Sequence, residues 1–116
     1  ADALNEVERA THYFNENYNL NISIKEYANE RHMSDCWFNR TFKHVTKVTP
    51  MQYIIQLRII NAINLLENTR YNIIQVANAV GYDDAYYFSR LFKKHTGVSP
   101  TEYRKKRELA KKAELS

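Results

Sequence analysis

The sequence predicts an all-α fold of seven helices in two similar halves, and three observations support this prediction. The chain has 116 residues but only two Gly and two Pro, which leaves little turn chemistry for β-hairpins. Apolar residues recur at helical rather than alternating spacing throughout. Residues 37–43 (WFNRTFK) return fifty positions later as residues 87–93 (YFSRLFK), so the second half of the chain repeats the first.

Capping residues mark most of the predicted helix starts. Four pairs have the capping-box spacing, in which Ser, Thr or Asn is followed three residues later by Glu or Gln: Ser23/Glu26, Thr49/Gln52, Asn72/Gln75 and Ser99/Glu102. Pro50 and Pro100 suit the first helical position after two of these caps. Ser34 and Asp83 are the expected caps of two further helices. The predicted helices span residues 3–17, 24–31, 35–45, 50–67, 73–80, 84–95 and 100–112.

These helices group into two pairs with a long helix between them. In each pair a short helix, a tight turn and a longer helix follow one another, which is the helix-turn-helix pattern. We therefore expect one domain, 1–116, with a first helix-turn-helix subdomain at 1–48, a linker helix at 49–68 and a second subdomain at 69–116. The apolar surface of the linker helix is too wide for one partner, so it is expected to pack against both subdomains.

The longer helix of each pair divides into a buried face and an outward face. The predicted inward residues are Phe38, Thr41, Phe42 and Val45 in the first copy, and Phe88, Leu91, Phe92 and His95 in the second. The four Phe residues are expected to anchor two small cores. The predicted outward residues are Cys36, Asn39, Arg40 and Lys43, and then Tyr86, Ser89, Arg90 and Lys93.

The outward residues suit the major groove of double-stranded DNA. A guanidinium can bond guanine O6 and N7, and a carboxamide can bond adenine N6 and N7, so Arg40 and Arg90 are the first candidates for base contacts. The net charge of +4 and the pI near 9.2 permit a polyanionic partner without proving one. On a single helix such residues would more often be a solvated surface, but two matched copies favour DNA binding.

The second half carries a family signature in residues 74–82 (IQVANAVGY) and 87–100 (YFSRLFKKHTGVSP), followed by Tyr103 and Arg104. With these motifs the chain resembles the DNA-binding domain of the AraC/XylS family of bacterial transcription regulators, from its first helix to Arg104. The resemblance implies two helix-turn-helix subdomains bridged by one helix. It further implies that helices 35–45 and 84–95 enter successive major-groove segments and that the protein regulates, mostly activates, transcription by RNA polymerase.

The resemblance also assigns contact residues, position by position. The base-contacting positions are Cys36, Asn39, Arg40, Ala85, Tyr86, Ser89 and Arg90. The phosphate contacts are expected from Lys43, Lys93, Lys94 and Arg104.

The first copy departs from the family pattern at its elbow, and Trp37 borders its groove-facing surface. His32 occupies the elbow where the family often has Gly, as Gly81 does in the second copy; His tolerates a positive φ better than most residues. Trp37 could touch the sugar-phosphate wall or cover the edge of the core. Because Trp is usually largely buried, packing is the favoured interpretation for Trp37 and for its counterpart Tyr87.

Other classes of protein find little support. Cys36 is the single cysteine, which excludes an internal disulfide and fits a reducing compartment, so a cytoplasmic location is expected. No apolar run is long enough to cross a bilayer, and no secretory leader is visible. We expect no metal site and no cofactor, because His12, His32, His44 and His95 share no ligand spacing. No phosphate loop or catalytic constellation occurs, so an enzyme is not expected.

One alternative is a helical protein-interaction module without sequence-specific DNA binding, which would use exposed aromatic residues such as Tyr13, Tyr18, Trp37 and Tyr86. A steep salt dependence of binding would separate DNA from a protein partner. The chain has no room for the effector and dimerisation domain that most family members carry. We therefore expect a monomeric fragment of a longer regulator, with a charged, fraying tail beyond Arg107.

Overall fold

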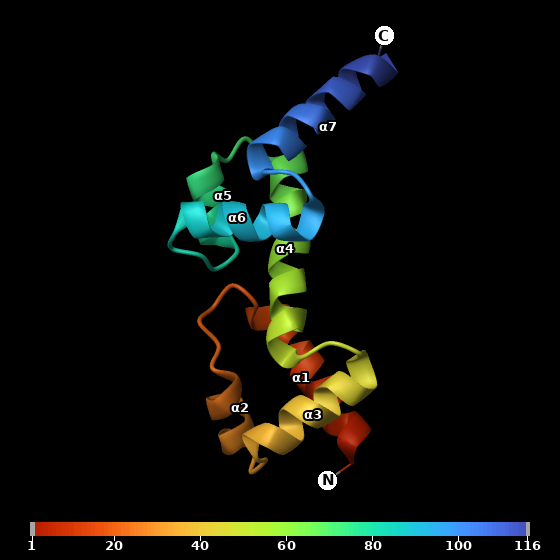
Figure 1. Ribbon diagram of the computed structural model, residues 1–116, viewed down its shortest axis with the longest axis vertical. Coiled ribbons are helices and arrows are strands. Elements are labelled where there is room, and N and C mark those ends of the chain that lie inside the picture. The colour runs from red at the N-terminus through yellow and green to blue at the C-terminus, as the bar shows by residue number, and fades with distance from the viewer. Residues whose placement is uncertain (1, 116) are drawn as a thin grey trace. The chain divides into compact units, whose positions relative to one another are not determined.

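The computed structural model describes residues 2–115. Seven α-helices and no strands occur in these residues, as the sequence predicts, and their ends lie within three residues of the predicted ones (Figure 1). The helices are α1 (Ala3–Asn17), α2 (Ile24–Glu30), α3 (Asp35–Thr46), α4 (Pro50–Asn68), α5 (Ile73–Ala79), α6 (Ala85–Thr96) and α7 (Pro100–Leu115).

The chain divides into two compact units between Leu57 and Arg58, within α4. The first unit holds α1, α2, α3 and the start of α4, and the second holds the rest of α4 with α5, α6 and α7. Each unit therefore contains one helix-turn-helix pair, α2/α3 or α5/α6. Apolar residues from both parts of α4 are buried, Ile54 in the first unit and Ala62 and Leu66 in the second.

Side-chain caps open all seven helices. The helix N–H groups are accepted by the side chains of Asp2, Ser23, Ser34, Thr49, Asn72, Asp84 and Ser99. Thr49/Gln52 and Asn72/Gln75 form complete capping boxes, in which the Gln side chain also accepts the cap's own N–H. The prediction that Asp83 caps α6 is wrong. Asp84 Oδ1 accepts the N–H groups of Tyr86 and Tyr87, and the helix begins one residue later than predicted.

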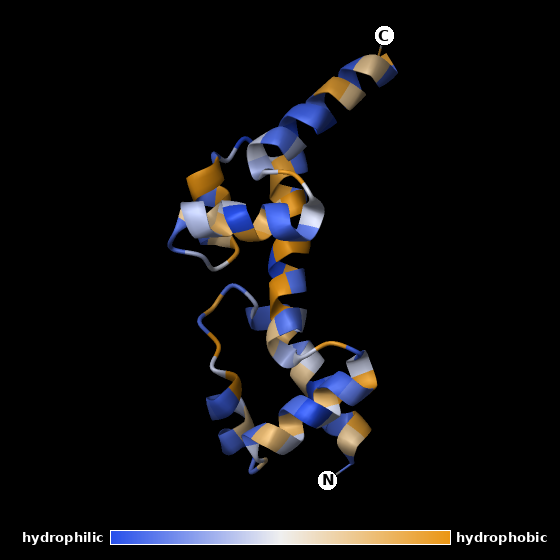
Figure 2. Cartoon of the chain, viewed as in Figure 1, coloured by the Kyte–Doolittle hydropathy of each residue, from blue (hydrophilic) through white to orange (hydrophobic). Residues whose placement is uncertain are grey.

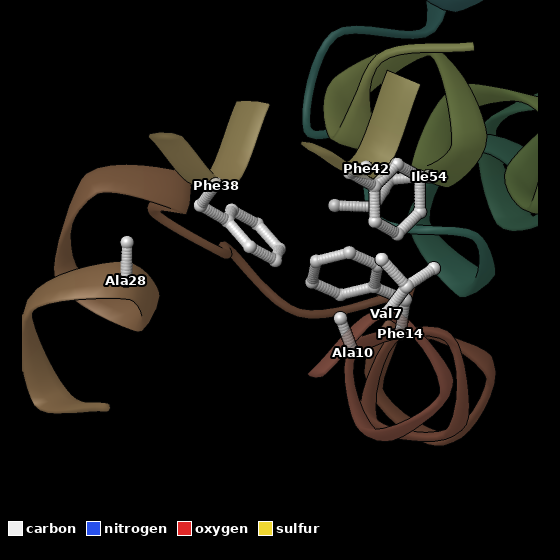
Figure 3. Packing of buried hydrophobic residues seen from close by; sticks show 7 residues of the cluster. All are labelled: Val7, Ala10, Phe14, Ala28, Phe38, Phe42 and Ile54. Carbon is white, nitrogen blue, oxygen red and sulfur yellow. The ribbon is translucent and has the colours of Figure 1, made fainter. Parts of the chain in front are cut away.

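The core of the first unit forms where α3 faces α1. Phe38 and Phe42 of α3 point toward Phe14 of α1, and the rings of Phe14 and Phe42 lie 5.9 Å apart (Figure 3). Tyr27 of α2 also packs on this group, with its ring 5.4 Å from that of Phe38. The buried members of this core are Val7, Ala10, Phe14, Ala28, Phe38, Phe42 and Ile54.

The second unit repeats this arrangement with its own aromatic residues. Phe88 and Phe92 of α6 are both fully buried, and their rings lie 5.9 Å apart. Tyr82 packs on Phe88, and Tyr103 meets the edge of Phe92. Hydrophobic residues are frequent along α4, which contributes to both cores (Figure 2). The remaining buried apolar residues of this unit are Ile59, Ala62, Leu66, Val76, Ala77 and Val80.

The four predicted Phe anchors are confirmed, but two other residues assigned to the inward face are exposed. Val45 is 37% exposed, and His95 is also exposed. Both lie in the last turn of their helix. A helical wheel gives the direction of a side chain but not the point along the helix where the covering elements end.

The basic C-terminal segment is helical rather than a fraying tail. α7 continues to Leu115, three residues beyond the predicted end, and three of its side chains bind Glu67 near the end of α4. The Arg107 Nε lies 3.3 Å from the Glu67 carboxylate, and Lys111 Nζ donates to the Glu67 carbonyl at 3.3 Å. The Glu67 carboxylate also accepts the Tyr103 hydroxyl and thereby raises the pKa of that phenol. Cations near the C-terminal carbonyls of a helix are stabilising, which favours this docking.

Replacement of Phe92 by Ala tests the assignment of the inward face. Because Phe92 is fully buried in a small core, Phe92→Ala is expected to lower the free energy of unfolding by about 3–5 kcal/mol. Thermal or urea denaturation measures this change. The matched control is Leu109→Ala on α7, where the side chain is 65% exposed and little change is expected. Unchanged stability of Phe92→Ala would show that the buried and outward faces of α6 are wrongly assigned.

Candidate nucleic-acid interface

The elbow that precedes α3 has the same backbone turn as the elbow that precedes α6. His32 has a φ of +61° and Gly81 a φ of +105°, so both occupy the left-handed region. The N–H of His32 donates to Asn29 O at 3.0 Å, and the N–H of Gly81 donates to Asn78 O at 3.2 Å. The first elbow therefore keeps the turn although it has His where the second has Gly, as the sequence predicts.

An ion pair between a half-buried Arg and a buried Glu holds the first elbow against α1. Arg31 directly precedes His32, and its guanidinium donates from Nε and NH2 to the two carboxylate oxygens of Glu6 at 3.2 and 3.0 Å. The Glu6 side chain is only 8% exposed. The hydrogen bond from Arg31 lowers the pKa of Glu6, against the opposing effect of burial. This two-point contact fixes the end of α2 and therefore the start of α3.

The outward face of α3 presents two exposed cations. Arg40 and Lys43 are exposed, and so is Cys36 one turn before Arg40. Asn39 lies beside them but is already engaged within the helix. Its Nδ2 donates to the carbonyl oxygen and to Oδ1 of Asp35, both at 2.8 Å.

The outward face of α6 presents a different set of groups. Tyr86 is 72% exposed, and the Arg90 guanidinium carbon lies 5.2 Å from the centre of its ring. This cation–π contact between residues one turn apart holds both side chains on one face. Ala85 and Ser89 are half-buried on the same side, while Lys93 and Lys94 are exposed.

Trp37 and Tyr87 occupy equivalent positions but differ in burial. Trp37 packs against the core of the first unit, as the sequence predicts. Tyr87 is 46% exposed, although its ring lies 5.9 Å from that of Tyr82. Trp37 therefore has the predicted packing role, whereas Tyr87 is only partly packed and leaves nearly half of its surface exposed.

Arg104, a predicted phosphate contact, is directed into the protein instead. Its guanidinium donates to the backbone carbonyls of Leu66, Thr69 and Tyr71 at 3.2, 3.4 and 2.6 Å. These bonds satisfy carbonyls at the end of α4 and in the segment that leads to α5. Arg104 therefore braces the second helix-turn-helix pair, and the geometry gives no support to a phosphate contact.

Sequence reasoning missed three of these contacts. Glu6 and Arg31 are 25 residues apart, and no local spacing links them. The carbonyls held by Arg104 likewise lie more than thirty residues away from it. The Asp35–Asn39 pair is different, because residues four apart on a helix face each other and could have been paired from the sequence.

A family model described as a helix-turn-helix domain matches residues 27–106. This range includes both helix-turn-helix pairs and the linker helix α4. The chain belongs to the AraC-type helix-turn-helix DNA-binding domains. The resemblance inferred from the sequence motifs is thereby confirmed.

Among curated proteins, this AraC-type domain is 37% identical over 94 residues to the MmsAB operon regulatory protein of Pseudomonas aeruginosa. The match covers 81% of this chain and 31% of that protein. The chain spans about a third of the length of the first curated relatives that it matches.

Two solved structures share the fold and a substantial part of the sequence. The C-terminal domain of AraT, a response regulator from Geobacillus stearothermophilus, superposes with a TM-score of 0.84 at 31% identity, over 87% of this chain and 84% of that one. The DNA-binding domain of AdpA, a global transcriptional factor solved in complex with a target DNA, has a TM-score of 0.84 at 25% identity, over 90% and 94%.

The family is one of transcription regulators rather than enzymes, in agreement with the absence of catalytic motifs from the sequence. Within residues 2–115, no helix combines the length and the apolar character needed to cross a membrane.

The Glu6–Arg31 pair predicts a pH dependence of stability. Because the folded state lowers the pKa of Glu6 below its ordinary value of 4.5, the pair stabilises the fold above that pH, and the stabilisation is lost as the pH falls below it. Glu6→Gln should reduce the free energy of unfolding by about 1–3 kcal/mol at neutral pH. Urea denaturation between pH 7 and pH 3 measures both effects.

The difference between wild type and Glu6→Gln should shrink toward the acid end of this range. Glu8→Gln, which removes an exposed carboxylate from the same helix, serves as the control and should leave the acid-side slope unchanged. A constant difference between wild type and Glu6→Gln at all pH values would contradict an ionic role for the pair.

Proposed function

We propose that this AraC-type domain recognises a specific double-stranded DNA sequence with two readers, α3 and α6, which enter successive major-groove segments. One observation carries the proposal. Each helix follows the same turn and presents an exposed Arg and Lys at the same register, Arg40 and Lys43 in α3 and Arg90 and Lys93 in α6. In a helix-turn-helix the second helix lies in the major groove, where Arg bonds guanine O6 and N7.

The proposed contacts with the DNA phosphates rest on the exposure of the other basic side chains of the two helices. Lys43, Lys93 and Lys94 are exposed in the C-terminal halves of the two readers, and we assign them to phosphates. We leave Arg104 out of the DNA contacts, because its guanidinium is held by three backbone carbonyls.

The two readers differ enough to recognise different bases. α6 carries Tyr86 stacked with Arg90, whereas α3 has Cys36 at the position of Tyr86. α3 also carries the Asp35–Asn39 pair, where α6 has Ala85 and Ser89. A monomer is therefore expected to bind an asymmetric site of two unlike blocks. Two equal blocks would arise only if two copies of the chain bound side by side.

We place this domain in a cytoplasmic transcription regulator that activates its promoter through contact with RNA polymerase. This part of the proposal rests on the resemblance to the AraC/XylS family.

Selection of bound duplexes from a random pool tests the proposal. We expect an asymmetric motif of two blocks about 10 base pairs apart, one turn of B-DNA. The affinity for the selected duplex should fall steeply with salt, because each neutralised phosphate releases counterions. Absence of an enriched motif, or salt-insensitive binding, would contradict sequence-specific DNA recognition and favour a protein partner.

Substitution of the two Arg residues tests the assignment of one reader to each block. Arg40→Ala and Arg90→Ala should each cost about 1–3 kcal/mol in binding to the selected duplex, because each removes a bidentate contact with guanine. Each variant should relax base preference in one block only, and the two blocks should differ. Competition with duplexes altered at single base pairs measures this.

Arg9→Ala is the matched control, since it removes an exposed Arg from α1, outside both readers. It should leave the base preference of both blocks intact. Relaxation of the same base pairs by Arg40→Ala and Arg90→Ala would exclude two separate readers.

A further inference from the structure

The side-chain amide of Asn39 is engaged within α3. Its Nδ2 lies 2.8 Å from two oxygen atoms of Asp35, the backbone carbonyl oxygen and carboxylate Oδ1. Both of these atoms only accept hydrogen bonds, so the group that faces them must be the NH2 and not the carbonyl of the amide. The NH2 group of Asn39 is therefore turned toward Asp35 within α3.

This arrangement changes what the first reader can offer to DNA. A carboxamide recognises adenine by donating to N7 and accepting from N6, but the NH2 group of Asn39 is already bound to Asp35. Its Oδ1 remains an acceptor. The Asp35 carboxylate also only accepts, and it has about four lone-pair sites, of which Asn39 uses one. Together the two side chains form a surface of acceptors.

Asp35 and Asn39, here called the acceptor pair, lie in the first turns of α3, the part of a recognition helix that contacts bases. Asp35 is the first residue of α3 and is exposed, and the N-terminal residues of a recognition helix are those that contact base edges. The hydrogen bond from Asn39 restrains this carboxylate at the first turn of the helix. The corresponding residues of α6 are Ala85 and Ser89, so the second reader has no carboxylate at this position.

We propose that the Asp35–Asn39 pair makes the first reader select cytosine at one position of its block, with Asp35 as the contacting residue and Asn39 as a positioning residue. This inference rests on the proposed two-reader function and specifies which base one reader takes.

Cytosine is the base whose major-groove edge suits an acceptor pair. It presents the N4 amino donor, from which a carboxylate can accept. Guanine presents N7 and O6 and thymine presents O4, all acceptors that repel a carboxylate. Adenine has an N6 donor but places the N7 acceptor beside it. Asp35 therefore selects by attraction to cytosine and by repulsion of the other bases.

The test compares wild type with Asp35→Ala and Asp35→Asn on the duplex selected by the wild-type protein and on its single-base variants. In wild type, replacement of one cytosine of the first block by thymine should weaken binding about tenfold. Both variants should lose this discrimination. Asp35→Asn keeps the size of the side chain but converts one acceptor into a donor, and circular dichroism confirms that each variant folds.

Binding to an unrelated duplex supplies a second readout. Because both substitutions remove a negative charge from the exposed start of α3, affinity for unrelated DNA should rise while discrimination falls. A uniform rise in affinity with the cytosine preference intact would overturn the inference and leave Asp35 with a role only at the helix start. Loss of binding to all duplexes by a folded variant would overturn it as well.

Asn39→Ala tests the positioning role. It leaves the carboxylate of Asp35 in place but frees it to turn, so the cytosine preference should weaken without the rise in affinity for unrelated DNA. Ser89→Ala is the matched control in the second reader and should leave the first block unchanged. If Asn39→Ala instead abolished a preference for adenine in the first block, the base would be read by Asn39 itself, and the inference would fail.

Failure of this inference is distinct from failure of the proposed function. If the wild-type protein selects two blocks, but no cytosine in either depends on Asp35, the two readers stand and the acceptor pair does not read DNA. If the wild-type protein selects no motif at all, the proposed function fails, and this inference fails with it.

Discussion

Burial of two Phe residues one turn apart is the constraint on which the interface depends. Phe38 and Phe42 in α3, and Phe88 and Phe92 in α6, are almost completely buried, so neither helix can rotate about its axis without exposing an aromatic ring. The rotation of each helix fixes which residues point outward. The positions of Arg40 and Arg90 on the surface are therefore a consequence of core packing and not an independent feature of the helix.

The two units reach the same helix-turn-helix geometry with different supporting contacts. In the first unit the Glu6–Arg31 pair ties the elbow to α1, whereas the position equivalent to Arg31 in the second unit is Val80, which is fully buried. In the second unit Arg104 braces the end of α4, whereas its equivalent in the first unit is the buried Ile54. The same turn is therefore kept in both units, although a polar side chain at each of these positions in one unit is matched by a buried apolar residue in the other.

Local sequence signals predict most of the fold, whereas contacts between residues far apart in the sequence could not be predicted. Capping residues and Pro mark the helix starts because they act within one turn, and the single error, Asp83 for Asp84, is one residue. The spacing of the Phe residues predicts the buried faces, but not that the packing stops before Val45 and His95. The inward turn of Arg104 depends on carbonyls that the fold brings close, and no sequence spacing encodes it.

We hold that α3 and α6, each fixed by a matching pair of buried Phe residues in its own unit, read different bases through their outward side chains. The most direct test of this claim is to give α3 the outward residues of α6 by combining Asp35→Ala, Cys36→Tyr and Asn39→Ser, since Arg40 and Lys43 already match Arg90 and Lys93. Selection from random duplexes should then yield two like blocks in direct repeat. If the variant folds and still selects the unlike blocks of the wild type, the outward side chains do not determine what each helix reads, and the account is wrong.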